Sequence, residues 1–283
     1  MSPPRTFTHI YGVDFSGAKL AGHNTWVAHV DLARRRPRLC ALNSLERLST
    51  HAERTPALTW LATTIARSDN ALWAMDFPFA LPVEVVSKGA TFDDQLTQIS
   101  RWKQGAYALG LRCVERSKRC AGKLHIRRTT DTEAKTPFDC YHYRIIYQTF
   151  HGMRDVLHPL RAHRQTAILP FDYRRLSRAR NALIESCPGS TLRRLGWPHN
   201  NYKQPTGGPL TPRRRRTRRQ ILDLLKRHVT ISPAHDRTIM RNPGADALDA
   251  VLAALAPALR WPTYPHRAIA RHPRYRLEGH VYT

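Results

Sequence analysis

Thr8-His-Ile-Tyr-Gly-Val-Asp-Phe-Ser-Gly-Ala18 combines a run of strand-forming residues with a short turn. The β-branched and aromatic residues of 8–15 predict a buried strand that ends at Asp14. Gly12 has no side chain, so it allows close approach of another part of the backbone. The small residues 16–18 then predict a tight turn. We therefore expect a carboxylate at the C-terminal end of a buried first strand.

The next segments predict an antiparallel meander. Residues 25–30 and 38–42 are the expected second and third strands, and the Arg-rich run 31–37 between them is typical of a hairpin. A helix is expected to start at Thr55, with Pro56 in its first turn. The apolar run 71–75 predicts a fourth strand, and Asp76 follows it directly. A second carboxylate is thus expected at a strand end.

Residues 83–180 are less regular and are interpreted as a largely helical insertion after the fourth strand. Its expected helices cover 93–109 and 141–160. Beyond the insertion we expect, in chain order, a strand at 182–185, a helical turn at 190–195, a loop at 200–212, a helix at 213–228, and a final helix at 243–259 capped by Asn242-Pro243.

This order of elements is the layout of the ribonuclease H-like fold. An Asp closes the first and the fourth strand, and carboxylates open the last helix. We therefore expect an α/β protein with a ribonuclease H-like mixed sheet flanked by helices. The 283 residues suit one domain, 1–283, in which 83–180 form the insertion and 200–230 form a basic loop and helix.

Four stretches in order resemble the signature motifs of the DUF429 family, predicted nucleases of ribonuclease H-like fold. These stretches are Gly12-Val-Asp-Phe-Ser-Gly-Ala18, Ala74-Met-Asp-Phe-Pro-Phe-Ala-Leu-Pro82, Ile184-Glu-Ser-Cys-Pro-Gly189 and Ala245-Asp-Ala-Leu-Asp-Ala250. Residues 127–152, with Lys135-Thr-Pro-Phe138 and Tyr147-Gln-Thr149, resemble the family's middle section. The resemblance extends from about residue 8 to Leu277-Glu-Gly-His-Val-Tyr282 and implies the same fold and a nuclease activity.

Asp14 and Asp76 are the best candidates for metal-dependent catalysis. Phosphodiester hydrolysis by two metals needs carboxylates that hold two divalent ions roughly 3.5–4 Å apart. Oxygen ligands favour Mg²⁺ or Mn²⁺. The chain has only 21 acidic residues, so acids at the ends of two buried strands are not what surface solvation predicts. The alternative is that each Asp only accepts hydrogen bonds from the turn that follows it.

Three further acids are candidates. Asp246 and Asp249 are three residues apart on a helix and so project from one face. The resemblance favours Asp249, because the apolar helix after it is like the one that follows the last catalytic acid of ribonuclease H-like resolvases. Asp246 has the alternative role of complementing the helix dipole, and Glu185 that of supporting the turn before Pro188. The predicted catalytic residues are Asp14, Asp76, Asp249 and Glu185, and the predicted ligands of two Mg²⁺ or Mn²⁺ ions are Asp14, Asp76, Asp246 and Asp249.

The charge of the chain indicates a polyanionic partner. The chain has 46 Lys and Arg against 21 Asp and Glu, a net charge of +25, and such a field attracts nucleic acid. The alternative is the Arg-rich composition of proteins from a GC-rich genome. The densest run, Arg213-Arg-Arg-Arg-Thr-Arg-Arg219, places like charges close together on a helix, unless it is a solvated loop. The predicted nucleic-acid contacts are Lys19, Lys135, Arg213, Arg214, Arg215, Arg216, Arg218 and Arg219.

Two other functions stay open at this point. One alternative to a nuclease is a basic nucleic-acid-binding protein without catalysis. The other is an actin-like ATP- or phosphate-binding enzyme. The latter needs a second domain and an adenosine-binding glycine pair, whereas Gly207-Gly208 lies in a basic linker. No stretch is long enough to cross a bilayer, and neither a secretory signal nor zinc-site spacing of the five cysteines is present. We expect a cytoplasmic protein without membrane contact.

Overall fold

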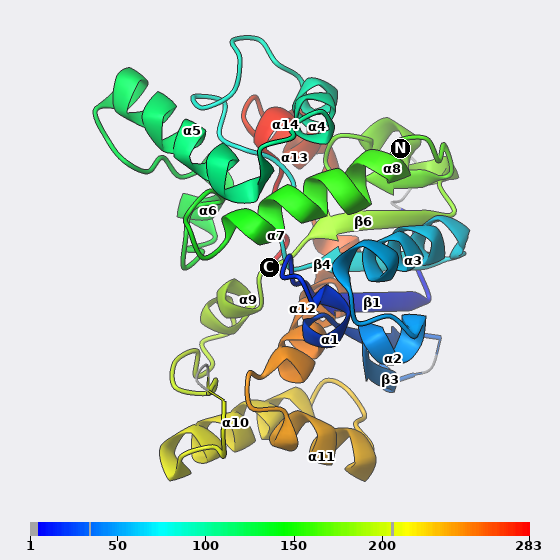
Figure 1. The fold of residues 1–283 in the computed structure, drawn as a ribbon. Coiled ribbons are helices and arrows are strands. Elements are labelled where there is room, and N and C mark those ends of the chain that lie inside the picture. The colour runs from blue at the N-terminus through cyan, green and yellow to red at the C-terminus, as the bar shows by residue number, and fades with distance from the viewer. Residues whose placement is uncertain (1–4, 34, 205–206) are drawn as a thin grey trace.

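The computed structural model describes residues 5–33, 35–204 and 207–283, which form an α/β fold around a six-stranded mixed sheet (Figure 1). The order of the strands across the sheet is β3-β2-β1-β4-β6-β5. The strands are β1 His9–Asp14, β2 Trp26–Asp31, β3 Arg38–Ser44, β4 Ala71–Met75, β5 Thr166–Ile168 and β6 Asn181–Glu185.

Strand pairing confirms the meander and brings three strand ends together. β2 is antiparallel to β1 and to β3, whereas β1, β4, β6 and β5 run parallel to one another. In the register of the sheet, Val13 lies opposite Met75, and Met75 lies opposite Glu185. The C-terminal ends of β1, β4 and β6 therefore share one edge, where Asp14 and Asp76 were expected to meet.

Helices cover both faces of the sheet. α12 (Asp246–Arg260) packs on β1 and β2 and shares a core with residues such as Leu72, while α3 (Arg54–Arg67) belongs to the core on the other face (Figure 1). A Cβ atom on Gly12 would lie 2.0 Å from the carbonyl oxygen of Ala250. Glycine at this position therefore lets α12 cross β1 in direct backbone contact, which confirms the close approach expected from the sequence.

The insertion is largely helical, as expected, but its helices differ from those predicted. The prediction of a single helix at 93–109 is wrong. One helix ends at Ser100, and a second begins at Gly105, which has a φ of +82°. The insertion also contributes the short edge strand β5, which was not expected. Its helices are α4 Phe92–Ser100, α5 Gly105–Ala121, α6 Thr129–Glu133, α7 Ile146–His151, the π-helical turn Gly152–Leu157 and α8 His158–Leu160.

The helix expected at 213–228 is confirmed as α10 (Pro212–Leu225), but α11 (Pro233–Arg241) was not expected. Asn242 ends α11, and α12 begins only at Asp246, after Ala245 with a φ of +73°. The predicted start at Pro243 is therefore wrong. The Asn242 side chain still serves α12, because its Oδ1 atom accepts a hydrogen bond of 3.3 Å from the backbone N–H of Ala247.

The remaining short elements complete the fold. They are α1 Ala21–Asn24, α2 Leu45–Ser49, α9 Pro188–Arg194, α13 His266–Arg271, α14 Tyr275–Glu278, and the 3₁₀ turns Tyr173–Arg178 and Trp261–Thr263. In the part of the chain that the structure describes, no helix combines the length and the apolar character needed to traverse a membrane.

Candidate functional site

Asp14, Asp76 and Asp249 converge at the shared strand edge. Asp14 is the last residue of β1, and Asp76 follows β4, where its backbone N–H donates to the carbonyl oxygen of Val13 at 2.9 Å. The side chains of Asp14 and Asp76 are close enough to interact, because the charge of Asp76 raises the pKa of Asp14. Asp249 lies in the first turn of α12 and is fully buried. Three separate segments thus bring one carboxyl group each to the same place.

The three carboxyl groups interact strongly. Burial, and then the charge of Asp249, raise the pKa of Asp14 well above its usual range. The same two causes raise the pKa of Asp76 to about 7. Burial also raises the pKa of Asp249, against the opposing effect of Lys203. The fully ionised cluster is therefore unfavourable on its own, and a cation would stabilise it.

Lys203 provides a cation within the protein. Its Nζ atom contacts Oδ2 of Asp249, and its side chain is 47% exposed. Burial opposes the charge of Lys203, but the Asp249 carboxylate raises the pKa of Lys203 well above its usual value. The hydroxyl of Tyr202 donates to Oδ1 of Asp249 at 3.1 Å. Both oxygens of Asp249 are thus in contact with polar groups of one short segment.

Sequence reasoning missed Tyr202 and Lys203. They lie in a segment without helix or strand, where no periodic pattern distinguishes one polar side chain from another. The aromatic–basic pair just ahead of the Gly- and Pro-rich stretch was the one available signal. Only the folded chain shows that this segment passes over the N-terminal end of α12.

Asp246 lies at the margin of the cluster. It is half-buried, and its Oδ2 atom accepts a hydrogen bond of 3.2 Å from the side-chain amide of Asn242. Its negative charge raises the pKa of Asp14 and of Asp249, but less than burial does. Asp249 is therefore the more central of the two helix carboxylates.

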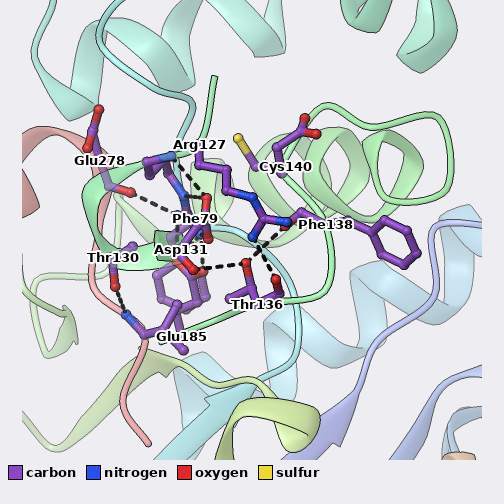
Figure 2. Close-up of polar contacts among 12 residues, drawn as sticks. Phe79, Arg127, Thr130, Asp131, Thr136, Phe138, Cys140, Glu185 and Glu278 are labelled. Atoms are coloured by element: carbon purple, nitrogen blue, oxygen red, sulfur yellow. Dashed lines mark hydrogen bonds and ion pairs between the residues drawn. The ribbon is translucent and has the colours of Figure 1, made fainter. Parts of the chain in front are cut away.

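Glu185 reaches the same edge but is engaged by the insertion (Figure 2). Nη1 of the fully buried Arg128 donates to Oε2 of Glu185 at 2.9 Å, and Nη2 donates to Oε1. The backbone N–H of Phe79 also donates to Oε2, at 3.0 Å. Arg128 further binds the Asp131 carboxylate and the carbonyl oxygen of Glu278. The carboxylate of Glu185 thus ties β6 to the insertion, and its negative charge also raises the pKa of Asp76.

Arg218 is wrongly predicted as a nucleic-acid contact. Its side chain is fully buried, and its guanidinium donates to the carbonyl oxygen of Tyr202 at 2.9 and 2.7 Å and to that of Pro243 at 2.8 Å. It also donates to the carbonyl oxygens of Ile239 and Asn242. Arg218 therefore fixes α10 to the segment that carries Lys203 and to the start of α12.

The other basic candidates are spread over three regions. Arg213, Arg215 and Arg216 are exposed on α10, and Arg219 pairs there with Asp236 at 3.0 Å. Arg214 is half-buried and donates to the side chain of Gln204 at 2.6 Å. Lys19 is exposed in the segment after β1, and Lys135 is exposed in the insertion. The exposed α10 cations are thus held, through Arg218, at a fixed place relative to the acid cluster.

The carboxylate oxygens of the acid cluster are donors of the type that hard divalent cations prefer. Among residues 5–33, 35–204 and 207–283, no group of three or more His, Cys, Asp or Glu side chains stands in a metal-binding arrangement. The cation in contact with Asp249 is instead the ammonium of Lys203. The residues that would supply oxygen ligands are Asp14, Asp76 and Asp249, whose mutual repulsion such an ion would relieve.

Comparison with known proteins identified no relative. No protein-family model, no curated protein and no solved structure matches the chain. The resemblance of the four motifs to the DUF429 family stays a prediction. The level of fold that is established is an α/β architecture with a six-stranded mixed sheet flanked by helices.

Proposed function

We propose that this chain is a metal-dependent nuclease of ribonuclease H-like fold that hydrolyses phosphodiester bonds of nucleic acid. The observation that carries the proposal is the convergence of Asp14, Asp76 and Asp249 from β1, the end of β4 and the first turn of α12. A chain with a net charge of +25 has little reason to gather three buried or half-buried carboxyl groups in one place unless they hold a cation.

The arrangement of elements supports the fold part of the proposal. β1 and β4 are neighbours in the sheet, and their parallel pairing brings Asp14 and Asp76 to one edge. α12 crosses β1 at Gly12, so the first turn of this helix reaches the same edge. Three of the four stretches that resemble the DUF429 family contain Asp14, Asp76 and Asp249, so the resemblance and the geometry point to the same acids.

The proposed chemistry divides between the acids and the basic groups. Bound Mg²⁺ or Mn²⁺ ions would activate water and stabilise the leaving oxygen. Asp14, Asp76 and Asp249 would hold them, with Asp246 at the margin. Lys203 would orient Asp249 and, because its side chain is 47% exposed, contact a phosphate of the substrate. The exposed arginines of α10 would bind the phosphate backbone without reading sequence.

A non-catalytic nucleic-acid-binding protein is the second candidate. The contact of Lys203 with Asp249 favours it, because this ammonium already neutralises part of the acid cluster. The two functions differ in one respect that can be measured. A nuclease loses cleavage on removal of the metal, whereas a binding protein cleaves nothing in any buffer.

The test is a cleavage assay with fluorescent single-stranded and duplex DNA and RNA. Wild-type protein, Asp14→Asn, Asp76→Asn and the exposed control Asp223→Asn are compared in Mg²⁺, Mn²⁺ and EDTA. We expect cleavage by the wild type and Asp223→Asn in metal only, and none by the other two variants. Asn keeps the volume of Asp but removes the charge that binds metal. Full activity in EDTA, or in Asp14→Asn or Asp76→Asn, would refute the proposal.

A further inference from the structure

A cavity lies at the other end of α12 from the acid cluster. Its volume is about 350 Å³, and it is bounded by α9, the C-terminal end of α12 and the segments around α13 and α14. Asp249 and Arg260 are 11 residues apart in α12, which corresponds to roughly 16 Å along a helix. The cavity is thus separate from the acid cluster, and an inference about it does not rest on the proposed nuclease function.

Two guanidinium groups give the cavity its charge. Arg194, in the last turn of α9, is exposed, and its side chain has no hydrogen bond or ion pair within the described residues. Arg260 donates to the carbonyl oxygen of Thr283 at 2.6 Å and lies 5.2 Å from the centre of the Tyr264 ring. Glu133 also lines the cavity, but its carboxylate accepts the hydroxyl of Tyr275. The cavity thus contains two guanidinium groups and one carboxylate, and Arg194 is the guanidinium whose hydrogen-bond donors are free within the described residues.

Two histidines add unused polar capacity. His272 and His280 line the cavity, and the Nδ1 atom of His280 is buried without a hydrogen-bond partner. Burial, and then the charges of His272 and Arg128, lower the pKa of His280 to about 3. His280 is therefore a neutral imidazole with one ring nitrogen that is free to take up a hydrogen bond from or to a ligand.

One wall of the cavity is aromatic. The ring of Tyr275 lies 3.9 Å from that of His272 and 4.6 Å from that of His280. The rings are tilted by 31° and 47° to one another, so they form a stepped aromatic surface against which a planar base can pack. The volume is in the range of pockets that bind small molecules and cofactors.

We infer that this cavity binds a phosphate monoester of nucleotide size. Arg194 and Arg260 are placed to bind the phosphate group, since guanidinium groups hold phosphate through paired hydrogen bonds. His280 Nδ1 and the hydroxyl groups of the cavity provide further polar contacts, and the His272–Tyr275–His280 surface faces the base. The phosphate belongs either to a free nucleotide or to the 5′ end of a nucleic acid.

The inference is tested by calorimetric titration of the full chain with AMP, adenosine and inorganic phosphate in EDTA. We expect saturable binding of AMP, competition by phosphate, and weaker binding of adenosine. Arg194→Gln should weaken AMP binding about 10-fold or more, because a charge-assisted contact is lost. Arg271→Gln removes the same charge from an exposed position outside the cavity and should leave the affinity unchanged. Arg194 is exposed, so its substitution should not disturb folding, which circular dichroism checks.

Two further experiments distinguish a free nucleotide from a nucleic-acid end, and the cavity from the acid cluster. A tetranucleotide that competes with AMP only when it carries a 5′-phosphate identifies a nucleic-acid end, and failure of both forms to compete identifies a free nucleotide. Asp249→Asn should bind AMP as the wild type does, which distinguishes this cavity from the acid cluster. The inference is overturned if AMP does not bind, if Arg194→Gln binds it like the wild type, or if adenosine binds as tightly as AMP.

Discussion

The ammonium of Lys203 contacts Oδ2 of Asp249, a carboxylate that is fully buried in the first turn of α12. The contact joins a segment without regular structure to the helix that carries the acid cluster. Arg218 holds this segment in place, because its guanidinium donates hydrogen bonds to the carbonyl oxygen of Tyr202, the residue before Lys203. A cation is therefore built into the cluster at a fixed position.

Lys203→Gln should destabilise the metal-free protein, because it leaves the buried carboxylate of Asp249 without a cation. The loss should be smaller in an Asp249→Asn background, where no charge needs neutralising. We expect a coupling energy of roughly 0.5–2 kcal/mol, at the modest end because half of the Lys203 side chain is exposed and solvent screens the ion pair. Urea unfolding of the two single variants and the double variant in EDTA measures it. Strictly additive effects would show that the contact has no energetic role.

Asp14→Asn and Asp76→Asn should each raise the melting temperature in EDTA. Burial and like charge raise the pKa values of both carboxyl groups in the native state, so each ionised group opposes folding at neutral pH. Removing one charge relieves that repulsion, and each kcal/mol gained in the free energy of unfolding raises the melting temperature by about 2–4 °C. Added Mg²⁺ should reverse the order by stabilising the wild type more. A lower melting temperature of both variants in EDTA would mean that these groups stabilise the fold as turn residues.

The acids at the strand ends were predictable because their positions follow from the local sequence pattern. Apolar runs that end in Asp14 and Asp76 predict strands, and parallel neighbours bring their ends together. Asp249 was found from its spacing on a helix and from family resemblance. Neither Lys203 nor the cavity around Arg194 was predictable, because their neighbours lie far away in the sequence and no periodic pattern marks them.

The errors have physical reasons too. Arg218 belongs to the densest run of positive charge, yet tertiary structure turns this one residue inward to bind backbone carbonyl groups. β5 has three residues, too few for a periodic signal. Asn242 was expected to cap α12 directly, but Ala245 adopts a left-handed conformation, and the helix therefore begins later.

Replacing Arg213, Arg215 and Arg216 by Gln should weaken nucleic-acid binding to a similar degree for all sequences. These residues are exposed on α10, and three lost phosphate contacts lower the slope of log affinity against log salt by up to about 3 units. Fluorescence anisotropy at several salt concentrations measures the slope. Arg218→Gln is the contrasting variant, and it should reduce stability instead. An unchanged slope in the triple variant would remove α10 from the interface.

His280 should make the protein sensitive to mild acid. Its pKa is about 3 in the folded state and about 6.5 in the unfolded chain, so the unfolded state binds more protons between these values. Stability should therefore fall as the pH drops from about 6.5 towards 3, by up to about 1.4 kcal/mol per unit. Urea unfolding should show a shallower fall for His280→Gln than for the wild type or the exposed control His163→Gln. Equal pH profiles for all three proteins would contradict this account of His280.

The most direct test of the acid cluster is Mn²⁺ binding, measured by the electron paramagnetic resonance signal of free Mn²⁺. We expect the wild type and Asp223→Asn to bind Mn²⁺ alike, and Asp14→Asn, Asp76→Asn and Asp249→Asn to bind it much more weakly. Asp246→Asn should have a small effect, because Asp246 lies at the margin and bonds to Asn242. If all these proteins bind Mn²⁺ equally, or if Asp246→Asn is more damaging than Asp249→Asn, the three converging carboxylates are not the metal site.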